Sequence, residues 1–356
     1  MPLHGLCRIL FAVLALAAGP ALAQPSAEHL AAAQREGVVV VYAATDEEIV
    51  QPVIDDFEAL HPGVKVEYHD MGSAEVYSRV VAEAARGQGP DVVWSSAMDL
   101  QVKLVNDGYA QPHRSAETAA LPAWAKWQDE AFGTSYEPVV IVYAAQYFAP
   151  DEVPYTHAAL LRLLAAQPVR FHGRVATYDP ARSGLGLLLL SQDAHANPTA
   201  FWRLARSLGA LGAHRHTTTA AMLDAVAEGE LLIGYNVLGS YAQARARHDP
   251  RLGIVWPRDY TLVLSRVALI TRNARHPEAA RLWLDYLLSA RGQRVLAESA
   301  GLYSVREDVS DHTASRLRQQ LGNAFRPIPI GTGLLAYLDQ VKQRDFLRQW
   351  VAALEP

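Results

Sequence analysis

From Gly37 onward, the chain alternates short β-rich runs with segments of helical periodicity. Val38 to Tyr42 is a solid apolar run, and residues 46–60 then carry apolar side chains at helical spacing before the turn His61-Pro62-Gly63. A fully apolar run is typical of a strand covered on both faces. Alternating units of this kind place helices on both faces of a mostly parallel sheet. The pattern therefore predicts an α/β fold.

The alternation continues through most of the chain. Further strands are expected at 64–68, 92–95, 139–143, 175–178, 231–235 and 254–256, with a long β-rich run at 262–271. Further helices are expected at 74–86, 158–165, 185–193, 199–208, 220–228, 277–288, 291–300 and 334–354.

The length of 356 residues favours two lobes, because a single hydrophobic core stops growing below about 300 residues. We expect residues 24–138, with a return segment at 258–310, to form lobe 1, and residues 139–257 to form lobe 2. Residues 311–356 are expected to be an extended connection followed by a helix.

The first 23 residues have the layout of a secretory signal peptide. His4 and Arg8 precede an apolar run from Ile9 to Ala18, and small residues at Ala21-Leu22-Ala23 predict cleavage before Gln24. The alternative is a membrane anchor, but the apolar run is shorter than the roughly 20 residues needed to span a bilayer. We therefore expect export to the periplasm.

Charge and cysteine content exclude two classes of function. The net charge is −5, and it becomes −6 once Arg8 is removed with the leader. Clustered basic residues, which nucleic-acid binding requires, are missing. The only cysteine is Cys7, within the leader. We therefore expect a protein without disulfides that binds no nucleic acid.

Ligands of open α/β sheets bind at the carboxyl ends of the strands. Three turns at such positions carry a hydroxyl just before or at the start of a helix: Thr45, Ser73 and Ser183-Gly184. A helix N-terminus presents free backbone N–H groups and a positive dipole end, which favour an anion. Ordinary helix capping is the alternative explanation of each turn taken alone. The full set of expected ligand-binding residues is Thr45, Ser73, Ser95, Ser96, Arg182, Ser183, Gly184, Tyr235, Asn236 and Ser240.

Two other groups of residues remain ambiguous. His214 and His216 could hold a transition metal on one side of a strand, or they could belong to a surface loop. Four tyrosines could line a pocket or fill the core: Tyr235, Tyr241, Tyr260 and Tyr303. No nucleophile elbow, paired-carboxylate motif or helix-borne metal pair is found in the sequence. We therefore expect a binding protein and not an enzyme, with no cofactor and no metal.

Several segments resemble bacterial extracellular solute-binding proteins of the ferric-iron type. The resemblance covers most of the mature chain, and the segments that carry it are 37–42, 57–66, 89–94, 178–186, 228–230, 277–280 and 302–306. It implies a type II periplasmic-binding fold, with a ligand in the cleft between two hinged lobes, serving an ABC importer.

The ferric members of that family hold iron with an adjacent pair of tyrosines. The comparable positions here are Gly239 and Ser240, with Tyr241 next to them. The sequence therefore looks more similar to the branch that binds phosphorylated organic anions or phosphonates. We expect a monomer that binds a small anionic solute by hinge closure and works with an ABC permease in the inner membrane. The alternatives are a ferric-iron binder, a ligand sensor that signals to a membrane histidine kinase, and an exported hydrolase.

Overall fold

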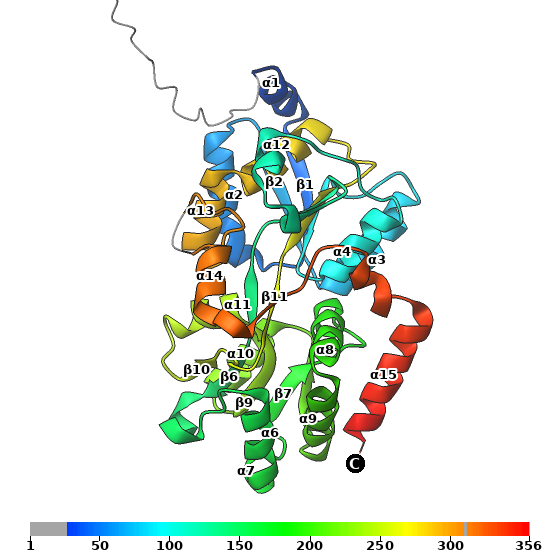
Figure 1. Cartoon of the computed structure of the whole chain (residues 1–356). Helices are drawn as coiled ribbons and strands as arrows, with labels where there is room; N and C mark the ends of the chain where they lie inside the picture. The colour runs from blue at the N-terminus through cyan, green and yellow to red at the C-terminus, as the bar shows by residue number, and fades with distance from the viewer. Residues whose placement is uncertain (1–26, 310–311, 356) are drawn as a thin grey trace, which may run out of the picture.

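Two β-sheets, each covered by helices, form two lobes in the computed structural model (Figure 1). The structure describes residues 27–309 and 312–355. The predicted signal peptide, residues 1–23, lies outside the described residues. In the part of the chain that is described, no helix is long and apolar enough to cross a membrane.

Lobe 1 contains a six-stranded sheet in the order β2-β1-β3-β12-β5-β4. Its strands are β1 (Val38–Ala43), β2 (Lys65–Asp70), β3 (Val92–Ser95), β4 (Lys126–Trp127), β5 (Ala131–Gly133) and β12 (Val267–Ile270). Its helices are α1 (Ala27–Glu36), α2 (Glu47–Leu60), α3 (Ser73–Ala84), α4 (Met98–Asn106), α5 (Ala116–Ala120), η1 (Ala123–Ala125), α12 (Pro277–Leu288) and α13 (Ala290–Glu298).

Lobe 2 contains the second sheet, in the order β13-β11-β6-β9-β7-β8 with β10 paired to β6. Its strands are β6 (Glu137–Ala144), β7 (Val175–Tyr178), β8 (His214–His216), β9 (Ile233–Leu238), β10 (Leu252–Val255), β11 (Thr261–Leu264) and β13 (Phe325–Pro327). The helices of its main segment are η2 (Ala145–Tyr147), η3 (Pro150–Glu152), α6 (His157–Ala166), α7 (Pro168–Phe171), α8 (Gly184–Ala196), α9 (Pro198–Ala210), α10 (Thr219–Ala227) and α11 (Gly239–Ala246).

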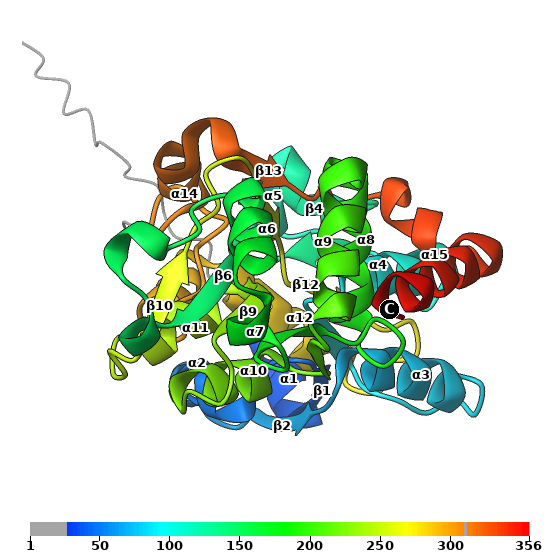
Figure 2. The ribbon, with the colours of Figure 1, turned by 90° about the horizontal axis from the view of Figure 1, so that it is seen from below.

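The C-terminal segment adds α14 (Ala314–Leu321), η4 (Gly322–Ala324), η5 (Thr332–Tyr337) and α15 (Gln340–Leu354). Figure 2 shows α15 lying beside α9 of lobe 2. The helix expected at 334–354 is therefore two elements, because the Asp339 carboxylate accepts hydrogen bonds from the N–H groups of Val341 and Lys342 and begins α15 there.

The expected two-lobed α/β fold is confirmed, but the sheets are mixed and not mostly parallel. Strands β1, β2 and β3 pair in parallel, as do β7, β8 and β9 where they adjoin. Strands β5 and β12 join the first sheet antiparallel, and β6 and β11 pair antiparallel in the second. The reason is that the chain crosses between the lobes in opposite directions, once from β5 to β6 and once from β11 to β12.

The apolar run at 262–271 feeds both sheets and is not a single strand. Its first part, β11, pairs with β6 in lobe 2, and its second part, β12, pairs with β3 in lobe 1. The return to lobe 1 therefore falls between Leu264 and Val267 and not at residue 258, where the sequence placed it. Hydrophobicity alone could not locate this point, because both halves are buried equally.

Candidate binding site between the lobes

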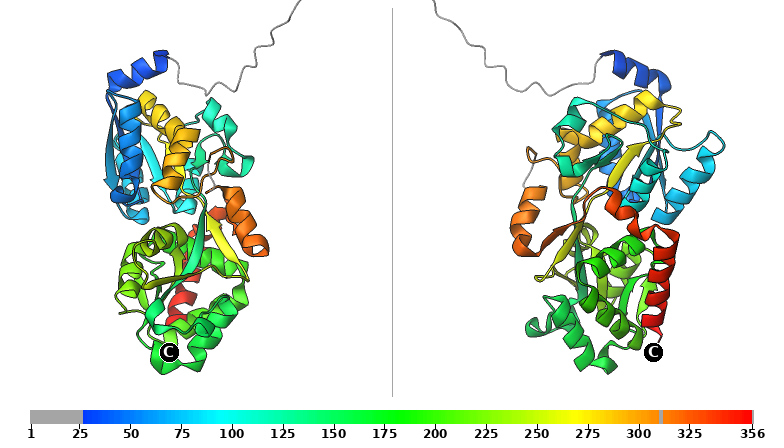
Figure 3. Two further views of the ribbon diagram at one scale, coloured as in Figure 1. Left: turned by 90° about the vertical axis from the view of Figure 1, so that its left-hand side faces the viewer. Right: turned by 45° about the vertical axis from the view of Figure 1, so that its right-hand side comes forward.

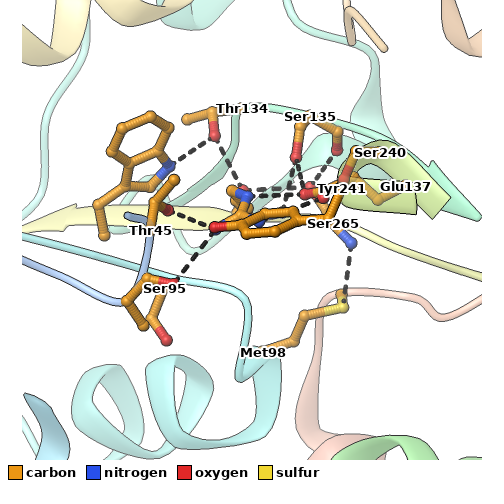
Figure 4. A network of polar contacts seen from close by, with 12 residues as sticks. Thr45, Ser95, Met98, Thr134, Ser135, Glu137, Ser240, Tyr241 and Ser265 are labelled. Atoms are coloured by element: carbon orange, nitrogen blue, oxygen red, sulfur yellow. Dashed lines mark hydrogen bonds and ion pairs between the residues drawn. The ribbon is translucent and has the colours of Figure 1, made fainter. Parts of the chain in front are cut away.

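The crossings from β5 to β6 and from β11 to β12 are held together by hydrogen bonds at the hinge. The Thr134 N–H donates to the Arg266 carbonyl at 2.8 Å, and the Arg266 N–H donates to the Ser135 Oγ at 3.0 Å. The Ser265 hydroxyl donates to the Ser135 carbonyl at 2.7 Å. These contacts, seen in Figure 4, hold the backbone segments that any movement of the lobes must bend.

A buried ion pair lies at this hinge. The Arg266 Nε is 2.8 Å from the Glu137 Oε1, and both side chains are fully buried. Burial alone would lower the pKa of Arg266, but the adjacent Glu137 carboxylate keeps that pKa above its usual value. Glu137 also accepts hydrogen bonds from the hydroxyls of Ser135 and Ser240. A charged pair is therefore fixed where the lobes meet.

Arg266 contacts residues of both lobes. Its Nη1 donates to the Thr45 Oγ1 and to the Ala44 carbonyl, directly after β1 of lobe 1. On the lobe 2 side, the guanidinium carbon lies 5.5 Å from the centroid of the Tyr241 ring in α11. Arg266 thus joins a strand end of lobe 1, the hinge and a helix of lobe 2.

Three tyrosines from different elements surround this cation. The Tyr68 hydroxyl donates to the Thr45 carbonyl at 2.8 Å, and the Tyr241 hydroxyl accepts from the Asp46 N–H at 3.3 Å. Tyr178, at the end of β7, shares a hydrogen bond with the Thr219 hydroxyl. Burial raises the pKa of all three phenols, to about 12 for Tyr241, and the Arg266 charge offsets part of this rise. All three are therefore neutral hydroxyls at neutral pH.

Two helix N-termini meet across the cleft. The Ser183 Oγ caps α8 by accepting from the Gly186 N–H at 3.1 Å. The Ser73 Oγ, at the start of α3 in lobe 1, accepts from the Leu185 N–H of lobe 2 at 3.0 Å. The first turn of α8 contains no acidic residue, whereas the first turn of α3 contains the exposed Glu75. Because both helices present the positive ends of their dipoles here, the contact is electrostatically suited to an anion.

The contact at α8 leaves no room for a side chain on Gly184. A Cβ placed there would lie 2.7 Å from the Leu100 Cδ1 and 3.1 Å from the Ser73 Oγ, both in lobe 1. Glycine therefore permits the close approach of the two lobes.

A groove opens beside this region at the surface between the lobes. It has a volume of about 500 Å³. Asp46, Glu48 and Ile49 line it from lobe 1, and Leu223, Tyr241 and Arg245 line it from lobe 2. Tyr241 both lines the groove and contacts Arg266, so its ring lies between the groove and the buried ion pair.

The structure brings together most of the sequence-predicted site residues. Thr45, Ser73, Ser183, Gly184 and Ser240 lie at the contacts just described. Ser95 and Ser96 are buried at the carboxyl end of β3. The Ser95 Oγ accepts from the Ala97 N–H at 3.1 Å, and Figure 4 shows Ser95 beside Thr45 and Tyr241.

Three predicted residues lie elsewhere. Arg182 is exposed. Tyr235 and Asn236 are buried inside lobe 2, where their side chains donate hydrogen bonds to the carboxylate of Asp193. Asp193 also accepts a hydrogen bond from the Tyr260 hydroxyl. Asn236 has a φ of 62°, which a β-strand residue adopts only at an irregularity. This backbone conformation occurs within β9, where the pairing of β6 with β9 shifts register.

The structure also shows where the two histidines and Tyr303 lie. The rings of His214 and His216 are 6.5 Å apart on β8, and His214 is exposed. Among the described residues, no group of three His, Cys, Asp or Glu side chains could hold a metal. Tyr303 is buried in a small cluster with Tyr136 and Val263.

Sequence reasoning missed Glu137 and Arg266. Both stand within or beside the apolar runs that form β6, β11 and β12. A charged residue in a buried run requires a partner, because an unpaired buried charge is costly. One acidic and one basic residue in such runs could therefore have indicated a buried ion pair between Glu137 and Arg266.

Two α/β lobes, joined by extended crossings and separated at the surface by a groove, define the class of two-lobed periplasmic binding proteins. The chain belongs to the bacterial extracellular solute-binding protein family, whose model matches residues 53–317. The family is extracellular or periplasmic, and its members work with membrane permeases. The protein is thus a solute-binding component of an ABC transporter.

Solved structures agree with this assignment. The substrate-binding protein of an ABC transporter from Agrobacterium tumefaciens is 39% identical, with a TM-score of 0.86, over 89% of this chain and 94% of that chain. The fold is shared with iron-bound HitA from Pseudomonas aeruginosa, at 15% identity and a TM-score of 0.70 over 89% of this chain and 99% of that chain. It is also shared with AfuA from Actinobacillus pleuropneumoniae with fructose-6-phosphate bound, at 17% identity and a TM-score of 0.72 over 90% of this chain and 99% of that chain.

A curated relative matches over a shorter region. The phosphoglycerate transport regulatory protein PgtC of Salmonella typhimurium is 31% identical over 111 residues, which are 31% of this chain. The match spans 27% of that relative.

Proposed function

We propose that this protein binds a small anionic solute between its lobes and delivers it to an ABC permease of the inner membrane. The solute class is a phosphorylated sugar, a phosphorylated organic acid or a phosphonate. Binding proceeds by closure of the hinge, with no covalent bond made or broken.

The observation that carries the proposal is the meeting of α3 and α8. Ser73 and Ser183 provide hydroxyls at two helix N-termini on opposite lobes, and the Ser73 Oγ accepts a hydrogen bond from the Leu185 N–H. Two positive dipole ends that lie close together repel, so a negative group beside them is favourable. An anion that binds next to this contact, within reach of both helix starts, would stabilise the closed arrangement more than the open one, which is the requirement for ligand-driven closure.

The surroundings of Arg266 support the same class of ligand. Thr45, Tyr68 and Tyr241 place neutral hydroxyls near a guanidinium whose charge is balanced by Glu137. Hydroxyl and N–H donors suit the several oxygens of a phosphate or phosphonate group. Among the structures of this fold, AfuA was solved with fructose-6-phosphate bound.

A thermal-shift screen tests the proposal. Sugar phosphates, phosphoglycerates, phosphonates, dicarboxylates and ferric citrate are added to the purified mature protein. A ligand that binds only the native state raises the melting temperature by mass action. We expect a rise with a phosphorylated compound or a phosphonate. Stabilisation by ferric citrate alone, or by none of these compounds, would contradict the proposal.

Point variants then locate the bound anion. The combined change Ser183→Ala and Ser73→Ala should weaken binding of the active compound by about 10-fold to 100-fold, because two hydrogen-bonding groups are lost. Ser78→Ala is the matched control, since Ser78 lies on the same helix α3 and is exposed. An unchanged dissociation constant in the double variant would show that the anion does not bind at the starts of α3 and α8.

The relative PgtC supports a second candidate function. Its name describes a regulatory protein of phosphoglycerate transport, and a regulatory binding protein would pass its signal to a membrane sensor. Purified protein with its ligand should then stimulate a histidine kinase encoded nearby, and it should leave the ATPase activity of a reconstituted permease unchanged. The opposite result would support transport.

A further inference from the structure

The C-terminal segment joins the lobes again, after the crossings from β5 to β6, from β11 to β12 and from α13 to β13. Residues 328–354, here called the C-terminal strap, begin in lobe 2, where the Ile328 N–H donates to the Val263 carbonyl at 2.8 Å. Helix η5 then packs against α4 of lobe 1, and α15 returns to pack along α9 of lobe 2. Figure 3 shows this path, with the red helix beside lobe 2 and its N-terminal end reaching lobe 1.

The strap packs closely against lobe 2 through α15. Phe346 and Trp350 of α15 are 4% and 2% exposed, and their rings lie 6.2 and 6.0 Å from the ring of Phe201 in α9. At Gly209, a Cβ would lie 2.5 Å from the Ala353 carbonyl oxygen. Helix α15 therefore sits directly on the backbone of α9, with two large aromatic side chains buried.

The attachment to lobe 1 is lighter. Within η5, Leu334 is buried, and Leu335 and Tyr337 are half-buried against the same core. The short helix is flanked or interrupted by Gly331 and Gly333, where an added Cβ would meet no atom within 4 Å. Helix η5 therefore has one buried side chain, whereas α15 has three. Short 3₁₀ helices with few buried contacts belong to the less stable parts of a fold.

The hydrophobic contacts make the strap part of the interlobe packing. Leu334 belongs to the same buried cluster as Met98 and Val102 of α4 and Phe201 of α9. The strap also passes the hinge, since a Cβ on Gly133 would lie 3.2 Å from the Ile330 Cδ1. When the lobes part, α4 and α9 separate, and the weaker of the two attachments has to give way.

We propose that η5 is a latch that holds lobe 1 in the closed arrangement and is released when the lobes open, while α15 stays on lobe 2. The latch favours closure whichever solute is bound. It therefore adds to the closed state a free energy that the solute does not have to supply.

The test measures the distance between the lobes in the ligand-free protein. Spin labels are attached at Ala82→Cys in lobe 1 and Val169→Cys in lobe 2, both of which replace exposed residues. In this background, Leu334→Ala removes the buried contact of η5. We expect the ratio of closed to open conformers to fall by about tenfold or more, as for other buried leucines. Leu334→Val is the milder variant and should cause a smaller shift in the same direction.

Val351→Ala is the matched control, because Val351 lies on α15 and is 47% exposed. It should leave the distance distribution unchanged. A folded Leu334→Ala protein with the parent's distribution would overturn the proposal. If the parent is already open, hydrogen exchange decides instead: rapid exchange at Leu338 with protection in α15 supports a released latch, and protection at Leu338 overturns it.

Discussion

The guanidinium of Arg266 and the carboxylate of Glu137 lie 2.8 Å apart with no exposed surface, at the point where the β5–β6 and β11–β12 crossings meet. Each charge depends on the other, because neither is solvated. The pair also links the two lobes, through Thr45 on one side and Ser240 on the other. We therefore expect its removal to affect the stability of the whole chain and not only ligand binding.

Glu137→Gln should lower the free energy of unfolding by about 3–5 kcal/mol, because it leaves the buried Arg266 without a counter-charge. Urea unfolding followed by circular dichroism measures this. The double variant Glu137→Gln with Arg266→Gln should recover part of the loss, since no unpaired charge remains. Asp345→Asn is the control, because Asp345 and Arg348 form an exposed pair, and it should change stability by less than about 1 kcal/mol.

Gly184→Ala should weaken solute binding while leaving the isolated lobes well folded. The added methyl group meets Leu100 and Ser73 of lobe 1 only when the lobes close. We expect a dissociation constant at least about tenfold higher, with a melting temperature of the ligand-free protein close to that of the parent.

Gly186→Ala provides the contrast for that experiment. Its added Cβ would lie 2.6 Å from the Tyr178 Cβ, inside lobe 2, so the clash is present in every arrangement of the lobes. This variant should lower the melting temperature without ligand. Equal effects of the two substitutions on stability would contradict the closed-state role of Gly184.

Asp99 should make stability depend on pH. Burial raises the pKa of this carboxyl from 3.8 to about 7. Between these values the folded state binds more protons than the unfolded state, so the free energy of unfolding falls as pH rises and levels off above about pH 7. Asp99→Asn removes this pH-dependent loss of unfolding free energy, which is on the order of 4 kcal/mol in total.

Urea unfolding of the parent and of Asp99→Asn at several values between pH 4.5 and 8 measures the Asp99 effect. The variant should gain stability relative to the parent as pH rises. A difference between the two proteins that stays constant with pH would show that Asp99 is not buried as described.

Asp193→Ala should destabilise the chain by about 3–5 kcal/mol, because it leaves the buried hydroxyls of Tyr235 and Tyr260 and the amide of Asn236 without their acceptor. Chemical unfolding measures this. Asp224→Ala is the control, since the Asp224 side chain is 55% exposed; its effect should stay below about 1 kcal/mol. Similar losses in both variants would argue against a special role for the Asp193 cluster.

Part of the site could be predicted because it follows directly from local sequence. Thr45, Ser73 and Ser183 stand beside or at helix starts, and helices after parallel strands begin at one edge of a sheet. Tyr235 and Asn236 follow the same rule but are turned inward. Their orientation depends on the irregular pairing of β6 with β9, which local sequence does not encode.

The sequence by itself determined the α/β class and the hydroxyl-bearing strand ends, because periodicity and capping act over a few residues. Its length indicated two lobes, because a single core does not grow to that size. Only the tertiary structure decided which residues meet at the hinge and across the cleft. Glu137 and Arg266 are 129 residues apart, and Ser73 is 112 residues from Leu185. Such pairings arise from the packing of whole elements, including a C-terminal strap that spans both lobes, and no local pattern specifies them.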